Sequence, residues 1–181
     1  MANLLRSLLI IMLVIVGMTV FMGLRWIDIN MDHRQFAIMS YLFTLFVQAF
    51  VMFYFIGISR LVKNVYEILH SEKDLDQLFD ENPGDLAPYK EKTIRFVQDS
   101  DRFKRQTIPW TMLMIILGAI AFLLGGAYDT HVVEKTTHSG VAYGFVFAML
   151  IGFFRQWYFL GKGHILLRKL KYLFSIPDGQ M

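Results

Sequence analysis

Histidine and carboxylate side chains gather in two short polar segments of the chain, each placed between long apolar runs. The set is Asp28, Asp32 and His33 in the first segment and Asp129, His131, Glu134 and His138 in the second. Imidazole and carboxylate donors suit zinc, copper or iron, so these residues are candidate ligands of a transition metal. His131, Glu134 and His138 have spacings that predict one shared face if the segment is helical.

A haem is a second cofactor that this set could hold. His33 and His138 each stand just before an apolar run, so they could ligate haem iron from two helices. The alternative is structural, because Asp and His are ordinary helix caps and head-group contacts beside membrane spans. Asp28 and Asp129 can equally cap helices or pair with Arg25 and Arg34. The chain has no HExxH motif, and the leading interpretation is that no metal or haem is held.

Other catalytic signatures are missing from the sequence. The chain contains no Cys, which excludes thiolate catalysis, disulfides and iron–sulfur clusters. It also contains no phosphate-binding glycine loop and no G-x-S-x-G nucleophile motif. We therefore predict that the protein is not an enzyme.

The elements that carry these residues are predicted from composition and length. Hydrophobic residues make up 55% of the 181 positions and charged residues 18%, against about 25% charged in a soluble domain. A membrane-spanning helix needs about 20 mostly apolar residues. Four runs qualify, at about residues 7–24, 36–61, 109–128 and 140–160. We predict an all-α integral membrane protein with four transmembrane helices, the first retained because no clear small-residue cleavage motif follows it.

The distribution of basic residues predicts the orientation. Nine Lys and Arg lie from Arg60, at the end of the second span, to Thr107, and four follow the fourth span, whereas the two short loops together hold three. Basic residues are enriched on the cytoplasmic side. We expect an inner (plasma) membrane protein with both termini in the cytoplasm. The same bias accounts for the net charge of +3, so no nucleic-acid partner is expected.

The chain also shows an internal repeat. Residues 53–57 (FYFIG) end the second span and residues 157–161 (WYFLG) end the fourth. This similarity predicts two copies of one helical hairpin, related by an axis along the membrane normal. The predicted organisation is a first transmembrane hairpin (1–61), a cytoplasmic helical extension (62–107), a second hairpin (108–161) and a basic amphipathic tail (162–181).

Small and polar residues recur at every fourth position of two spans. They are Gly140, Gly144, Ala148 and Gly152 in the fourth span and Ser40, Thr44 and Gln48 in the second. Small residues let helices approach closely, and hydroxyl and amide groups can bond across helices in lipid. We predict that the second and fourth spans meet at the axis of the repeat, with Gln48 opposite Gly152. The competing interpretation is that one stripe faces another subunit.

Apart from Arg60 at the very end of the second span, Arg155 is the one ionised residue inside a predicted span. It either extends toward the membrane surface from an aromatic belt, or pairs with a carboxylate or an anionic lipid. The tail beyond it is basic and amphipathic, which suits a lipid head-group surface. Its basic residues are Lys162, Arg168, Lys169 and Lys171.

The extension between the second and third spans has the periodicity of two helices. The first should continue out of the second span, and the second should cover about residues 88–106. Pro109 fits the first turn of the third span. The hairpin could pack on itself, dock on a partner or lie on the anionic leaflet. Docking is the interpretation we favour, because both signs of charge are present.

These features favour a non-enzymatic, structural or accessory subunit of a larger inner-membrane assembly. Its partners would be membrane lipids and other membrane subunits, or further copies of itself. One alternative is a metal- or haem-binding redox subunit with its site at the outer helix ends. The other is a small oligomeric channel or transporter along Ser40, Thr44 and Gln48.

Overall fold

The computed structural model describes residues 1–27, 32–79 and 83–174. Its elements are α1 (Ala2–Gly23), α2 (His33–Ser71), the short 3-10 helix η1 (Leu75–Gln77), α3 (Ala87–Asp129) and α4 (Lys135–Phe174). None of the described residues lies in a strand. All four α-helices are long and apolar enough to cross a membrane, which confirms the predicted all-helical class with four candidate spans.

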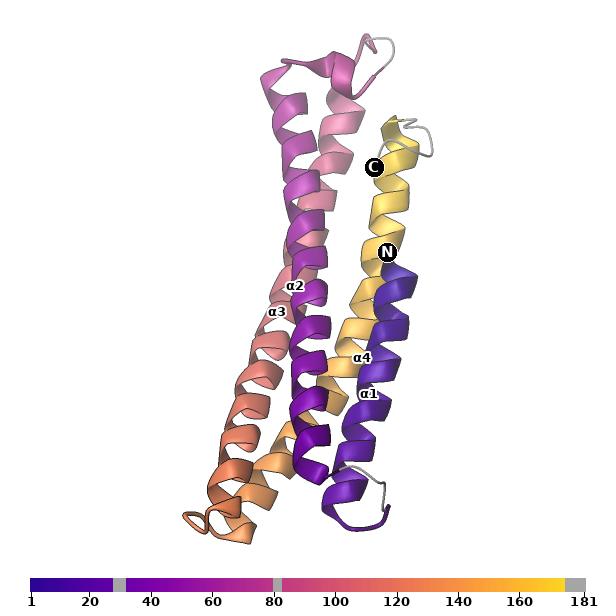
Figure 1. The fold of residues 1–181 in the computed structure, drawn as a ribbon. Coiled ribbons are helices and arrows are strands. Elements are labelled where there is room, and N and C mark those ends of the chain that lie inside the picture. The colour runs from indigo at the N-terminus through magenta and orange to yellow at the C-terminus, as the bar shows by residue number, and fades with distance from the viewer. Residues whose placement is uncertain (28–31, 80–82, 175–181) are drawn as a thin grey trace.

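The four helices run up and down along one axis (Figure 1). The connection from α1 to α2 and the connection from α3 to α4 lie at the same end, called the loop end below. Each helix packs on the next in chain order, and α4 packs back on α1. The helices α2 and α4 also contact each other across the bundle. The helices α2 and α4 are therefore diagonal neighbours that meet at the centre of the bundle.

Three of the four helices are much longer than a membrane requires. The helices α2, α3 and α4 have 39, 43 and 40 residues, whereas α1 has 22. At a rise of 1.5 Å per residue the long helices extend about 60 Å, twice the roughly 30 Å of a bilayer's hydrocarbon core. They continue past the beginning of α1 at the end opposite the loops (Figure 1). We call this three-helix projection, residues 62–107 and 162–174, the arm.

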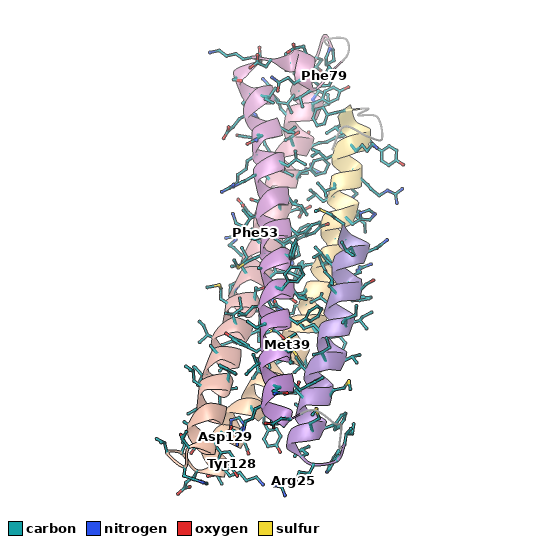
Figure 2. The ribbon with its side chains drawn as sticks, in the orientation of Figure 1. Arg25, Met39, Phe53, Phe79, Tyr128 and Asp129 are labelled. Carbon is teal, nitrogen blue, oxygen red and sulfur yellow. The ribbon has the colours of Figure 1, made fainter. Side chains whose placement is uncertain are left out.

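The arm has an apolar core of its own. Its buried side chains come from all three helices and include Leu69, Phe103, Leu166, Leu170 and Phe174. Near its tip, the ring of Phe79 lies 5.4 Å from that of Phe174 and 4.9 Å from that of Tyr89. Figure 2 labels Phe79 at this end of the molecule.

Residues 162–174 share this core with the extension. We expected a two-helix extension and, after the fourth span, a basic amphipathic tail that suits a lipid head-group surface. Instead, residues 162–174 continue α4 without a break and pack their apolar side against α2 and α3. The physical reason is that Leu166, Leu170 and Phe174 repeat every fourth residue, so they form one stripe that the neighbouring helices cover.

The long helices pass through the predicted boundaries between span and extension. The helix α2 continues out of the second span, as expected. In contrast, Pro109 does not begin a helix, because it lies inside α3. Proline removes one N–H donor and crowds the carbonyl four residues earlier. Thr107 and Thr111, on either side of Pro109, are both buried, and α3 continues across this position.

An ion cluster fastens α2 to α3 where the arm begins. The carboxylate of Asp101 lies 3.1 Å from Lys104 Nζ and 3.3 Å from Lys63 Nζ, and accepts a 3.0 Å hydrogen bond from Ser59 Oγ. Partial burial by itself raises the pKa of Asp101, but the hydrogen bonds from Lys104, Ser59 and Lys63 outweigh it and lower that pKa. The carboxylate is therefore ionised at neutral pH and bridges both helices.

Candidate functional site

Two histidines lie at the loop end, one in each helical hairpin, and each ring packs against a glycine. His33 begins α2, and a Cβ added to Gly23 at the end of α1 would lie 3.1 Å from His33 Cε1. His138 lies in the first turns of α4, and a Cβ added to Gly125 of α3 would lie 3.2 Å from His138 Cε1. Each imidazole therefore occupies the space that a missing side chain leaves on the neighbouring helix.

Both imidazoles have a buried nitrogen that is not hydrogen-bonded. The Nδ1 atoms of His33 and His138 are inaccessible to solvent and have no hydrogen-bond partner among the described residues. Burial lowers the pKa of His33, and the positive charge that His138 can carry lowers it further. The nearby carboxylates of Asp32 and Asp129 oppose that shift only in part. His33 is therefore neutral at pH 7, with a nitrogen lone pair or N–H group inside the protein.

Polar and aromatic contacts surround this histidine pair. Arg34 Nε lies 2.9 Å from Asp129 Oδ2 and so joins the beginning of α2 to the end of α3. The ring of Tyr128 is parallel to that of His138, with centroids 6.2 Å apart. Figure 2 labels Tyr128 and Asp129 at the loop end. The predicted pairing of an aspartate with Arg34 is thus present for Asp129.

The remaining candidate ligands do not join the histidines in one cluster. His131 and Glu134 precede α4, which begins only at Lys135, so the expected helical face shared by His131, Glu134 and His138 does not form. His131 adopts a left-handed backbone conformation (φ 58°) in the turn, and Glu134 accepts a hydrogen bond from Thr136. The turn separates His131 from His138, whereas Glu134 directly precedes α4.

The two other aspartates are accounted for differently. Asp32 is the N-cap of α2 and accepts a 3.3 Å hydrogen bond from the backbone N–H of Arg34, which agrees with the structural alternative. Asp28 lies outside the described residues. Within the part of the chain that the structure describes, no three His, Asp or Glu side chains come together as a metal site.

A second polar group lies at the centre of the bundle. Gln156 Nε2 of α4 lies 2.7 Å from Gln48 Oε1 of α2 and 2.9 Å from Thr111 Oγ1 of α3, and donates to both. Gln48 Nε2 lies 3.3 Å from Met12 Sδ of α1. All four side chains have 0% exposure. We call them the central amide node, in which each helix of the bundle contributes one residue.

Sequence reasoning did not single out Gln156. A signal for it is present, because Ala148, Gly152 and Gln156 follow one another at intervals of four and are all buried. An amide on a stripe of small residues indicates a helix-to-helix hydrogen bond, and such a bond in a membrane is worth about 0.5–2 kcal/mol.

The predicted small-residue stripe is divided between two environments. Gly152 packs against Met114 of α3, whose Cε would lie 2.7 Å from an added Cβ. Ala148 is buried, whereas a Cβ at Gly140 or Gly144 would meet no described atom within 4 Å. The stripe therefore packs inside the chain only at the end near the arm.

The polar stripe of α2 is buried throughout, but one member bonds differently from our expectation. Gln48 bonds across the bundle, while the hydroxyl of Thr44 donates to the carbonyl of Ser40 on its own helix, at 2.9 Å. A threonine hydroxyl in a helix readily bonds to the carbonyl one turn earlier. Among the described residues, Gln48 is the member of this stripe whose side chain bonds to another helix.

The basic residues near the arm lie on the surface of α4. The guanidinium of Arg155 donates to the backbone carbonyl and to the side-chain Oε1 of Gln106 in α3, and it lies 5.6 Å from the ring centre of Trp110. Its partners are thus an amide and an indole of α3. The other basic residues follow along α4 and are Lys162, Arg168, Lys169 and Lys171.

No protein-family model, curated protein or solved structure matches this chain.

Proposed function

We propose that this chain is a multi-pass inner-membrane protein with its termini and arm in the cytoplasm, and that it serves as a non-enzymatic accessory subunit of a larger assembly. The arm is the observation that carries this proposal. Three helices cross the apolar region and continue into the arm without a break, and the arm has its own core. Such a projection has a fixed position relative to the spans, as the docking element of a subunit requires.

The surface of the arm suits a partner that binds and leaves. Exposed charges of both signs cover it, including the pairs Lys90–Glu72 and Arg95–Glu91. A few apolar side chains stand among them, and Tyr172 is 74% exposed. Polar surface with separate apolar anchors is typical of non-obligate protein interfaces.

We also infer that the two hairpins are copies of one unit. The contacts of His33 with Gly23 and of His138 with Gly125 are equivalent within their hairpins. Both hairpin loops lie at the same end of the bundle (Figure 1). The axis relating the copies would pass between α2 and α4, the helices that touch across the bundle.

Site-specific photo-crosslinking in cells tests the accessory role. A crosslinking amino acid at Tyr172 of the arm should capture another protein, or a second copy of the chain. The matched control is Phe53, which is 66% exposed in the apolar part of α2 and should capture lipid instead. Mass measurement of the native complex in mild detergent then gives its composition. A stable monomer without protein crosslinks at Tyr172 would contradict the proposal.

A second candidate function is redox chemistry at the histidine pair. The favouring observation is that His33 and His138 each have a buried Nδ1 without a hydrogen-bond partner in the described structure. Two imidazoles match the two axial ligands of a haem better than the three or four ligands of a zinc site. Visible absorption and metal analysis of the purified protein test this candidate. Colourless, metal-free protein that still supports its assembly would eliminate it.

The structure does not favour the channel alternative. Ser40, Thr44 and Gln48 are at most 3% exposed inside a single chain. A pore formed between several copies would need these side chains on the outer surface, so the stripe acts in packing.

A further inference from the structure

A continuous groove lies between α3 and α4 where the arm begins. It consists of two adjoining depressions that share Arg102, Tyr158 and Phe159. One depression extends to Phe154, and the other extends along the arm to Lys169. The groove therefore reaches from the predicted fourth span into the arm.

The groove is strongly basic. Arg102, Arg155, Lys162 and Lys169 line it, and Asp99 is the single carboxylate among its lining residues. The excess of positive charge makes the groove complementary to an anion.

Two of these cations are already held in place. Arg155 is fixed by Gln106 and Trp110, as described above. The Nζ atom of Lys162 lies 5.4 Å from the ring centre of Tyr158. In contrast, Arg102 is exposed and forms no ion pair with any residue that the structure describes. A bound anion would thus meet one free guanidinium and two pre-positioned cations.

Exposed aromatic surface adjoins the charges on the side of the predicted span. Phe154 is 68% exposed and Tyr158 is 56% exposed. Aromatic residues together with Lys and Arg mark the depth at which hydrocarbon gives way to head groups. Basic pockets between helices on the cytoplasmic side recognise anionic head groups.

We propose that this groove binds one anionic phospholipid, with its phosphate between Arg102, Arg155 and Lys162 and an acyl chain along Phe154. Phospholipid suits the groove better than a soluble phosphate, because the charged and the apolar parts are continuous. The site goes beyond the accessory role, and it rests on the proposed embedding in the membrane.

Native mass spectrometry of the full chain in mild detergent tests the site. Phosphatidylglycerol and phosphatidylcholine with identical acyl chains are titrated, and phosphatidylglycerol should be retained preferentially. Arg102→Gln and Lys162→Gln should each weaken its binding about fivefold, since one charge near an anionic head group contributes on this scale. Arg168→Gln is the matched control, because Arg168 is exposed on α4 but lies outside the groove.

Three outcomes would overturn the proposal. They are equal binding of the two lipids, an effect of Arg168→Gln as large as that of Arg102→Gln, and displacement of the lipid by glycerol 3-phosphate alone. Failure of membrane embedding gives a different result, because the chain would then leave the membrane fraction in a carbonate wash.

Discussion

The central amide node and the Nδ1 atoms of the loop-end histidines are both buried polar groups, but among the described residues only the node is hydrogen-bonded. Gln156 donates to Gln48 and Thr111, and Gln48 contacts Met12, so the amides are matched by groups on other helices. His33 and His138 leave their buried Nδ1 atoms without a described partner. Burying an unpaired polar group costs free energy, whereas a paired one can stabilise the fold. The hydrogen bonds of the node join α4 to α2 and α3 at the centre of the bundle.

The largest expected effect is at the glycine one turn before Gln156. In Gly152→Leu, the new side chain must displace the fully buried Met114, which should destabilise the protein by about 1–3 kcal/mol. Gly144→Leu is the matched control and should change stability by less than about 0.5 kcal/mol, because its surroundings are open. Reversible unfolding in detergent measures both. Equal effects at the two glycines would show that the node does not depend on close packing.

Removing one amide of the node should have the next largest effect. Gln156→Leu leaves the carbonyl of Gln48 without its donor, and we expect a loss of about 1–2 kcal/mol. The double variant Gln48→Leu/Gln156→Leu removes both partners and should lose less than the sum of the single variants. Additive losses in this cycle would mean that the two amides do not interact.

Acidification should act on the histidine pair and leave the node unaffected. The pKa of His33 is lowered in the folded protein from 6.5, so the unfolded chain binds more protons at mildly acidic pH. The contribution of neutral His33 to the free energy of unfolding is therefore fully present above pH 6.5. This contribution is lost as the pH falls below that value. His33→Phe keeps an aromatic ring over Gly23 and should reduce this loss between about pH 7.5 and about pH 5 in a thermal unfolding series. If the stability of the variant depended on pH as that of the unaltered protein does, His33 would not be the group that causes the loss of stability in acid.

The smallest expected effect is on the ion pair beside the histidines. Arg34→Gln breaks the contact with Asp129, and the Arg34 side chain is 63% exposed. An exposed pair of this kind contributes about 0–1 kcal/mol, and less at high salt. Unfolding measurements in low and high salt should show the small difference disappearing. A larger loss of stability that does not depend on salt would mean that Arg34 also supports the packing of His33 and His138.

The sequence by itself determined the four long apolar helices, because hydrophobicity over about 20 residues is a local property of the chain. It also indicated that α2 continues beyond its span. The His33 and His138 positions were found as ligand candidates from residue type alone.

Only the tertiary structure decided which of these groups meet. The pairing of Gln156 with Gln48, the seating of each histidine on a glycine, and the packing of residues 162–174 into the arm all depend on how each helix is rotated toward its neighbours. The position of Pro109 inside α3, rather than at the beginning of a helix, was also visible only in the structure. The periodicity of the sequence shows which face of a helix is buried. Which other helix packs against that face depends on side chains that are far away in the sequence.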